Sequence, residues 1–317
     1  MTELFTVIGS IFGLIAVGYG AARSGLLGAA VSPALNEFVF VVAIPVLLFR
    51  TIVTADFGGI APWALWLTYF SSVGFTWGVA HWLARRAFGG DARLGVVAGI
   101  SASFSNTVLI GIPLVQSVLG ERGLVAVLVI VAIHLPVMML ASVTLFEWAR
   151  RADGVDAGPV AVGPLLRHFG LSLARNPLVI GILAGAAWRL TGLPLTGVPG
   201  RLADSLAQVA GPTALFSAGM SLAAYGIGRN LRHAGVTSAL KLALMPAVAL
   251  AVGTLVGLPP AFLAACVLVA GCPTGVNPYL IATRLQTGQA LAASAMTLST
   301  ALGAGTVALW LLVVRPG

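Results

Sequence analysis

The chain has 317 residues, of which 59% are hydrophobic and only 8% are charged. Soluble domains carry about 25% charged residues, so this composition excludes a soluble protein and indicates a polytopic membrane protein. The formal net charge of +8 does not indicate a nucleic-acid partner, because the arginines stand singly or in pairs at the ends of apolar segments, as membrane topology requires.

About ten apolar segments follow one another along the chain, and crossing a bilayer takes roughly 20 residues each. In chain order they are Leu4–Ala22, Leu35–Val53, Ala61–Leu83, Leu94–Leu119, Leu124–Phe146, Pro177–Leu193, Leu202–Ala224, Val236–Leu258, Ala261–Leu285 and Ala290–Val314. The fourth and the ninth are interrupted by polar residues, glycine and proline. The sequence therefore predicts an all-α membrane protein of about ten transmembrane helices, two of which are broken.

A short polar stretch, Arg150–Pro159, divides the chain near its middle. The predicted organisation is a first five-helix repeat over residues 1–149, a linker over 150–163 and a second five-helix repeat over 164–317. With ten spans both termini lie on one side, and the other side collects about twice as many arginines. By the positive-inside rule the linker faces the cytoplasm and both termini face outside, in the cell (inner) membrane.

Short matches between the two halves indicate an internal repeat. The pattern Pro-x-x-Leu-Phe begins at Pro45 and again at Pro212, and Gly120 after the first broken segment has a counterpart in Gly288 after the second. An odd number of spans in each half turns the second copy upside down. The matches thus predict an inverted repeat of five helices plus five.

The two breaks carry the chemistry of this sequence. Unpaired backbone groups are costly in hydrocarbon, so broken segments are tolerated only where they line a protein cavity. A half-helix that restarts after a break presents free N–H groups and the positive end of its dipole, which suits an anion. The alternative is that these residues only cap kinked helices. Candidate substrate-binding side chains are Ser105, Asn106, Thr107, Thr274 and Asn277, and the expected structural residues of the crossover are Gly111, Pro113, Pro273, Gly275 and Pro278.

Four further residues are candidates within the spans. Pro45 and Pro212 stand mid-span and are expected to place two kinked helices across the pocket from each other. Lys241 could attract an anionic substrate or extend its amine to the membrane interface. His134 could carry protons or remain a neutral, hydrogen-bonded core residue.

Motifs for other chemistry are missing. The sequence has no ATP-binding loop, no His-Glu-x-x-His and no grouped nucleophile and base, so an enzyme is not expected. Cys266 and Cys272 share one apolar segment and indicate neither a disulfide framework nor a metal site, and no cofactor is expected. Carboxylates are nearly absent from the spans, which disfavours a sodium cage of Asp and Glu, although backbone carbonyls at a break could still hold a cation.

In the order of its motifs the chain resembles the auxin efflux carrier family, the bacterial relatives of the plant PIN-formed carriers. The resemblance covers nearly the whole chain and rests on Gly18–Leu27, Ala43–Phe49, Asn106–Pro113, Asn176–Gly181, Ala214–Leu222 and Lys241–Pro246. It implies the inverted fold of bile-acid sodium symporters, crossing fourth and ninth helices, a homodimer and elevator-like alternating access. It also implies an organic anion as cargo, held at Asn106 and Asn277. The short central linker departs from the plant members.

The sequence is thus interpreted as a secondary transporter of a small organic anion, such as an auxin-like monocarboxylate, malate or malonate. A sodium-coupled symporter of the bile-acid type is the alternative within transport. A membrane sensor is the alternative from another class, but a chain of 317 residues leaves no room for an added soluble domain.

Overall fold

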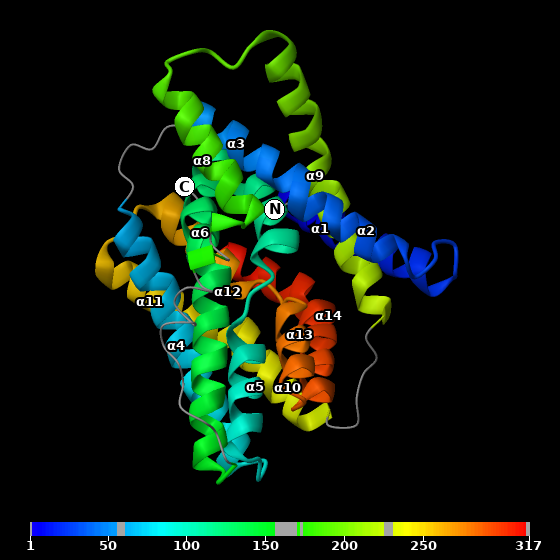
Figure 1. Ribbon diagram of the computed structural model, residues 1–317, viewed down its shortest axis with the longest axis vertical. Coiled ribbons are helices and arrows are strands. Elements are labelled where there is room, and N and C mark those ends of the chain that lie inside the picture. The colour runs from blue at the N-terminus through cyan, green and yellow to red at the C-terminus, as the bar shows by residue number, and fades with distance from the viewer. Residues whose placement is uncertain (1, 56–60, 156–169, 172–173, 225–230, 315–317) are drawn as a thin grey trace.

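The computed structural model describes residues 2–55, 61–155, 170–171, 174–224 and 231–314, so most of the predicted linker lies outside the described residues. Within these ranges the regular structure is helical, and one isolated β-bridge joins two irregular segments (Figure 1). In chain order, with π-helical turns marked η, the helices are α1 (Thr2–Arg23), α2 (Val31–Phe38), η1 (Val39–Ala43), α3 (Ile44–Thr54), α4 (Pro62–Arg86), α5 (Ala92–Ser103), η2 (Thr107–Gly111), α6 (Ile112–Ala152), α8 (Pro177–Leu190), α9 (Gly197–Ala224), α10 (Leu231–Ala239), η3 (Leu240–Leu244), α11 (Met245–Val256), α12 (Pro260–Gly271), α13 (Asn277–Arg284) and α14 (Gln289–Val313).

Several of these helices are long and apolar enough to cross a membrane. Among the described residues, five stretches meet both conditions of length and composition: Thr6–Arg23, Val31–Thr54, Thr107–Ala152, Leu231–Val256 and Gln289–Val313. The predicted broken segments do not meet them, because α5 and α12 have only 12 residues each. The structure is therefore that of an all-α polytopic membrane protein.

Helix α6 contains the end of the predicted span Leu94–Leu119 and the whole of the predicted span Leu124–Phe146. Its 41 residues would extend roughly 60 Å as one straight helix, about twice the hydrocarbon thickness of a bilayer. The backbone leaves helical geometry once, at Gly120, with φ 61° and ψ −151°. Only glycine adopts this conformation readily, which explains why glycine stands where the sequence predicts a turn between two spans.

Helix α4 shows how the protein meets lipid. Trp63 near its start and Trp82 near its end are 63% and 59% exposed, and Phe75 between them is also exposed. Large apolar side chains on an outer face are stable in lipid but not in water, and tryptophan favours the two membrane interfaces. This pattern places the ends of α4 near the two headgroup levels.

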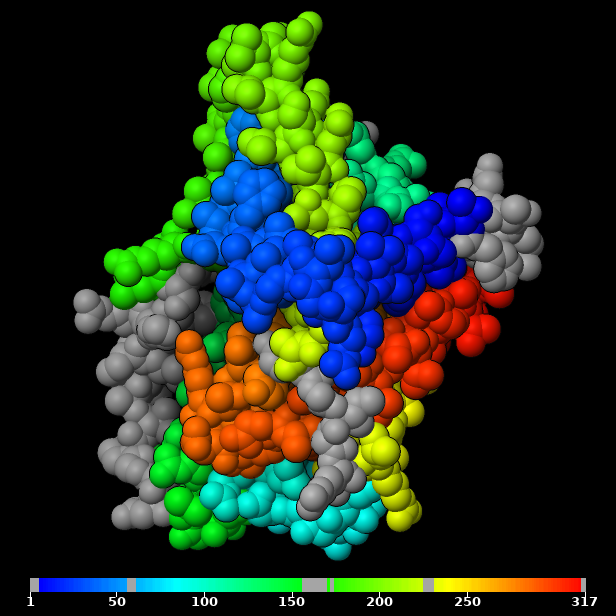
Figure 2. Space-filling model, turned by 90° about the vertical axis from the view of Figure 1, so that its right-hand side faces the viewer, coloured from blue at the N-terminus to red at the C-terminus, as the bar shows by residue number. Residues whose placement is uncertain are grey.

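The helices form two groups. In the first group α1 packs along α9, α3 packs along α8, and α2 and α3 also touch α9. In the second group α4 packs on α5 and α11, and α12 packs on α11 and α6. Figure 1 shows the first group in blue, green and yellow-green above the second, and Figure 2 shows the blue N-terminal helices above orange and red C-terminal residues.

Glycines let the helices of the first group approach one another closely, and two of these approaches are related. A side chain at Gly18 of α1 would collide with the carbonyl oxygen of Phe216 on α9, and one at Gly185 of α8 would collide with that of Phe49 on α3. The sequence separation between Gly18 and Gly185 equals that between Phe49 and Phe216. The two helix pairs thus pack by the same contact at one constant offset, which is also the spacing of the Pro-x-x-Leu-Phe pattern.

The helix ends gather as the predicted topology requires. At one end Arg50 pairs with Asp204 and, at 3.5 Å, with Glu121. At the other end the Asp153 carboxylate accepts hydrogen bonds from the backbone of α5 and from Arg93. Residues expected on one side of the membrane are therefore neighbours in space.

Candidate functional site

The two broken helices meet at their breaks. Between α5 and η2 the chain runs extended past the segment between α12 and α13, and Ser105 faces Thr274 in an antiparallel bridge. The Asn106 N–H donates to the Pro273 carbonyl at 2.8 Å, and the Gly275 N–H donates to the Phe104 carbonyl at 3.1 Å. The sequence separation between Phe104 and Pro273 equals that between Asn106 and Gly275. Each break thus satisfies the backbone of the other in a symmetrical pair of hydrogen bonds.

The first break restarts with a side-chain cap. Asn106 Oδ1 accepts from the Leu109 N–H at 3.2 Å, and the Asn106 carbonyl accepts from the N–H groups of Ile110 and Gly111 at 3.3 and 2.9 Å. The wide π-helical turn η2 follows from this bonding and leads to Pro113, whose missing N–H is harmless in the first turn of α6. Among the described residues no partner meets the Asn106 amide nitrogen.

The second break restarts without such a cap. Val276 precedes α13 and has no side-chain oxygen to accept its first N–H groups, and Pro278 contributes no N–H. Asn277 opens α13, is partly exposed, and makes no side-chain hydrogen bond within the described part of the chain. The start of α13 therefore keeps donors available for a ligand.

The carbonyl ends of the two half-helices before the breaks are also satisfied. Thr274 Oγ1 donates to the Ser101 carbonyl at 2.7 Å, near the end of α5. Near the end of α12 the Lys241 ammonium donates to the Ala270 carbonyl. Lys241 is fully buried, so its amine does not extend to the membrane interface.

A small cavity of about 40 Å³ lies beside the crossing. It is large enough for about one water molecule. Its walls bring together many of the predicted site residues, namely Ser105, Asn106, Thr107, Gly275 and Asn277, with His134 of α6, Phe40 of η1 and Leu178 of α8. Residues of both breaks therefore line one cavity.

His134, in the wall of this cavity, is a buried histidine without hydrogen-bond partners among the described residues. Its side chain is 2% exposed, and neither ring nitrogen has a hydrogen-bond partner among the described residues. Phe104 and Tyr69 meet it edge to face, with centroids 4.8 and 5.5 Å away. The Tyr69 hydroxyl also has no hydrogen-bond partner among the described residues. Unpaired buried polar groups are costly, so they mark a place where a ligand or water is expected to bind.

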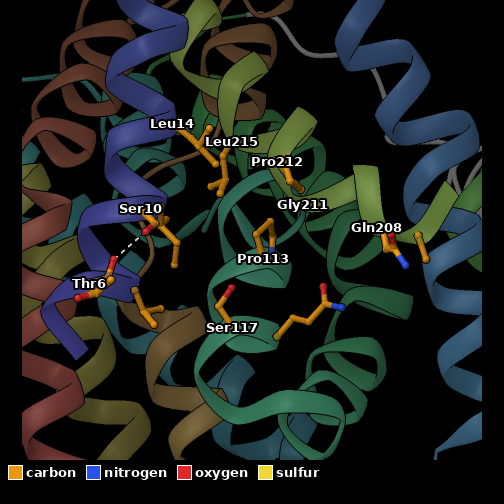
Figure 3. Close-up of a pocket in the computed structure, with 13 residues that line it drawn as sticks. Thr6, Ser10, Leu14, Pro113, Ser117, Gln208, Gly211, Pro212 and Leu215 are labelled. Carbon is orange, nitrogen blue, oxygen red and sulfur yellow. Dashed lines mark hydrogen bonds between the residues drawn. The ribbon is translucent and has the colours of Figure 1, made fainter. Parts of the chain in front are cut away.

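A larger cavity of about 430 Å³ lies between α1, α9 and the start of α6 (Figure 3). Figure 3 shows Pro113 and Pro212 on its wall, with Ser117 and Gln208 nearby. A neighbouring cavity of about 280 Å³ shares Gln116, Ala207 and Gln208 and reaches Arg50 and Asp204. The polar lining is uncharged except at the Arg50 end.

The remaining predicted residues lie apart from these cavities. Pro45 is buried against Gly181 of α8 and lines none of the three, so it does not face Pro212 across a pocket. Lys241 lies behind the crossing, on η3. Sequence reasoning missed Gln116 and Gln208, although two glutamines within apolar segments were a signal. It also missed Ser299, whose hydroxyl accepts from the Thr274 N–H, and here the sequence offered no signal.

No group of three potential metal-binding side chains occurs among the described residues. The site instead offers amides, hydroxyls, an imidazole and the open start of a short helix. These groups suit the binding of a polar or anionic solute.

The fold and the paired breaks are those of a membrane transport protein, and comparison with known families gives the same class. Residues 4–311 match the model of a family described as membrane transport protein. The chain therefore belongs to this family, which confirms the predicted resemblance to the auxin efflux carriers.

Two relatives match almost end to end. A protein of Rhizobium meliloti, provisionally named a malonate transporter, is 30% identical over 336 residues, covering 100% of this chain and 98% of the relative. An uncharacterized transporter of Methanothermobacter thermautotrophicus is 25% identical over 317 residues, covering 96% of each protein. Similarity to named transporters thus extends through both breaks and both helix groups.

Proposed function

We propose that this protein is a secondary active transporter that carries a small organic anion, with a short dicarboxylate such as malonate as the first candidate. The open start of α13 beside the unpartnered amide of Asn106 is the observation that carries the proposal. Helix N-termini and amide donors bind carboxylates without any fixed charge. The name of the Rhizobium relative supports malonate, and malate or an auxin-like monocarboxylate would engage the same donors.

In this proposal Asn106 and Asn277 donate to the substrate carboxylate, and Ser105 and Thr107 add hydroxyls. The His134 imidazole supplies a further donor and is the candidate proton carrier, since substrate binding would satisfy its unpartnered nitrogens. The cavity of about 40 Å³ is too small for a dicarboxylate. Binding therefore requires the crossing to move relative to η1 and α8.

The movement proposed is an elevator. The group of α1, α2, α3, α8 and α9 acts as a fixed scaffold, and the group with the two broken helices carries the substrate. The large cavity supports this division, because its walls come from α1 and α9 of the first group and from α6 of the second. The constant offsets within the scaffold contacts and within the crossing support an inverted repeat of five helices plus five, which supplies two alternative resting positions.

We further propose a homodimer in the cell (inner) membrane, with the linker in the cytoplasm and both termini outside. Single cysteines at the exposed positions Arg151 and Arg122 would test the orientation. Cys266 and Cys272 are buried, so they give little background. A membrane-impermeant thiol reagent should label Arg122→Cys in intact cells and leave Arg151→Cys unlabelled. The reverse pattern would invert the topology.

A carrier is favoured over an enzyme because the crossing presents amides and hydroxyls and lacks a nucleophile paired with a base. The first experiment is thermal unfolding of the purified protein with a panel of mono- and dicarboxylates. A ligand at 100 times its Kd stabilises the folded state by about 2.7 kcal/mol. Uptake of radiolabelled malonate into proteoliposomes follows. If no carboxylate either stabilises the folded protein or enters the vesicles, the proposed function is wrong.

A further inference from the structure

The two half-helices that lead into the breaks end differently. The sequence separation between Ser101 and Ala270 equals that between Phe104 and Pro273, whose carbonyls accept the paired hydrogen bonds at the crossing. The Ser101 carbonyl accepts from a neutral hydroxyl, that of Thr274, whereas the Ala270 carbonyl accepts from the ammonium of Lys241. When the Lys241 amine is protonated, equivalent backbone positions differ by one full positive charge.

That charge is built into the interior. Lys241 belongs to η3, which packs on α4, α5, α12 and α14, and its side chain is fully buried. Among the described residues no carboxylate forms an ion pair with it, and Glu121, Glu147, Asp153 and Asp204 pair instead with arginines near the helix ends. A buried charge with no counter-ion is strongly unfavourable in a membrane protein unless it has a partner during function.

The carboxyl end of α12 provides part of the negative potential that stabilises a charge at Lys241. The last carbonyls of a helix lack internal donors and carry the negative end of its dipole, so they favour a cation. In carriers with broken helices such carbonyl ends can coordinate a coupling sodium ion. Here the Ala270 carbonyl already accepts from an ammonium, whose charge would repel a second cation. The residues present at this end therefore do not fit sodium.

We propose that Lys241 is a tethered cation that replaces a coupling sodium ion at the crossing, so that anion binding by this protein is independent of sodium. The inference rests on the proposed function, because the anion that completes the charge balance is the substrate. Lys241 lies behind the crossing and lines none of the three cavities, so it acts as a positioning residue for the broken helix and contributes an electric field at the anion.

The test compares malonate binding to purified protein in sodium chloride and in choline chloride at equal ionic strength. Wild-type affinity should be the same in both salts. Lys241→Ala should bind about tenfold more weakly in choline chloride. Sodium or propylammonium, which has the size of the deleted side-chain segment, should restore the affinity of this variant.

Two variants complete the experiment. Lys241→Arg keeps the charge and should keep wild-type affinity within a few-fold. Ser238→Ala removes a buried hydrogen bond to the Ala295 carbonyl, one turn before Lys241, without removing charge, and should bind equally in both salts. Sodium-dependent binding by wild type would overturn the inference. Unchanged affinity of Lys241→Ala, or a weakening that neither cation restores, would also overturn it.

A readout without substrate separates this inference from the proposed function. Thermal unfolding of Lys241→Ala should occur at higher temperature in sodium chloride than in choline chloride, whereas wild type should unfold alike in both. Equal unfolding of the variant in the two salts would overturn the inference even if malonate is not the substrate. Failure of wild type to bind any carboxylate would instead overturn the proposed function.

Discussion

The two breaks share one symmetrical pair of backbone hydrogen bonds and differ in the side chains around it. At the first break the helix before it begins with an aspartate cap at Asp91, and the chain after it restarts with Asn106 as a cap. At the second break the helix before it begins with Pro259 and the chain after it restarts from Val276, neither of which caps. The difference teaches that the paired backbone hydrogen bonds determine the shape of the crossing, while the side chains make one half rigid and leave the other open to a ligand.

The backbone pair is the shared element, so breaking it should have the largest effect. Gly275→Pro removes the N–H that donates to the Phe104 carbonyl and leaves that carbonyl unpaired at membrane depth. The expected loss of stability is about 3 kcal/mol or more. Thermal unfolding in detergent and the yield of folded protein measure it.

Gly275→Ala is the matched control. A Cβ at this position would lie 3.5 Å from the Asn106 Cα, which is ordinary van der Waals contact. This variant should therefore fold nearly as wild type does. Equal stability of the proline and alanine variants would show that the hydrogen bond between the breaks contributes little.

The two asparagines should separate capping from binding. Asn106→Ala and Asn277→Ala each remove a proposed hydrogen bond to a carboxylate, worth roughly 1.5–3 kcal/mol, or about one to two orders of magnitude in affinity. Only Asn106→Ala also removes a cap, which should lower stability by about 1 kcal/mol. Isothermal titration with malonate and thermal unfolding measure the two effects. Near-wild-type affinity in both variants would remove the crossing from the binding site.

The start of the first broken helix should respond to acid. Burial alone raises the pKa of the Asp153 carboxyl, but hydrogen bonds from the N–H groups of Ala92 and Arg93 and from the Arg93 guanidinium outweigh it, so the pKa lies below its ordinary value. The stabilisation is therefore complete above about pH 4 and is lost as the pH falls below it. Asp153→Asn should lose about 1–2 kcal/mol at pH 7 and should show less further loss in acid.

Glu147→Gln is the control for Asp153. Glu147 pairs with Arg150 one turn away on the helix surface at 3.3 Å, and partly exposed pairs of this kind contribute about 0.5 kcal/mol or less. Unfolding midpoints between pH 3 and pH 7 compare the two variants. If both lose the same stability with the same pH dependence, Asp153 does not anchor α5.

A smaller effect than that of Asp153→Asn is expected at the end of the first half-helix. Thr274→Val deletes the hydroxyl that donates to the Ser101 carbonyl while keeping the shape of the side chain, and should cost about 1 kcal/mol. Thr274→Ser keeps the donor and should be closer to wild type. Thermal unfolding should occur at the highest temperature in wild type, next in Thr274→Ser and lowest in Thr274→Val. A Thr274→Val variant more stable than Thr274→Ser would contradict a stabilising role of this hydrogen bond.

Much of the fold followed from the sequence because glycine, proline and asparagine within apolar segments have few explanations in a membrane. The positions of both breaks, the turn at Gly120 and the meeting of Asn106 with Asn277 were predicted in this way. The Pro-x-x-Leu-Phe pattern gave the sequence separation between the two repeats. It did not reveal the close approach of Gly18 and Gly185 to the facing phenylalanine carbonyls, because that approach depends on tertiary packing.

Other features could not be read from the chain. The partner of Lys241 lies near the end of α12, beyond the whole of α11, so no local pattern distinguished burial from an interfacial position. Asp204 and Glu121 are about half exposed and both pair with Arg50, a contact between residues that are far apart in the sequence. The sizes of the cavities belong to the one conformation that the structure shows. The sequence is compatible with all conformations of the protein, so it does not predict these sizes.

The hydrogen bonds between the breaks also set the order of events during synthesis. Asn106 and Phe104 find their partners only when Pro273 and Gly275 have been made, about half the chain later. At roughly 5–20 residues per second, that interval is roughly 10–30 s. For that time the first half holds unpaired backbone groups at membrane depth, a state that hydrocarbon does not stabilise. The crossing that makes the site is thus also the step that completes insertion, and the ribosome reaches it almost at the end of the chain.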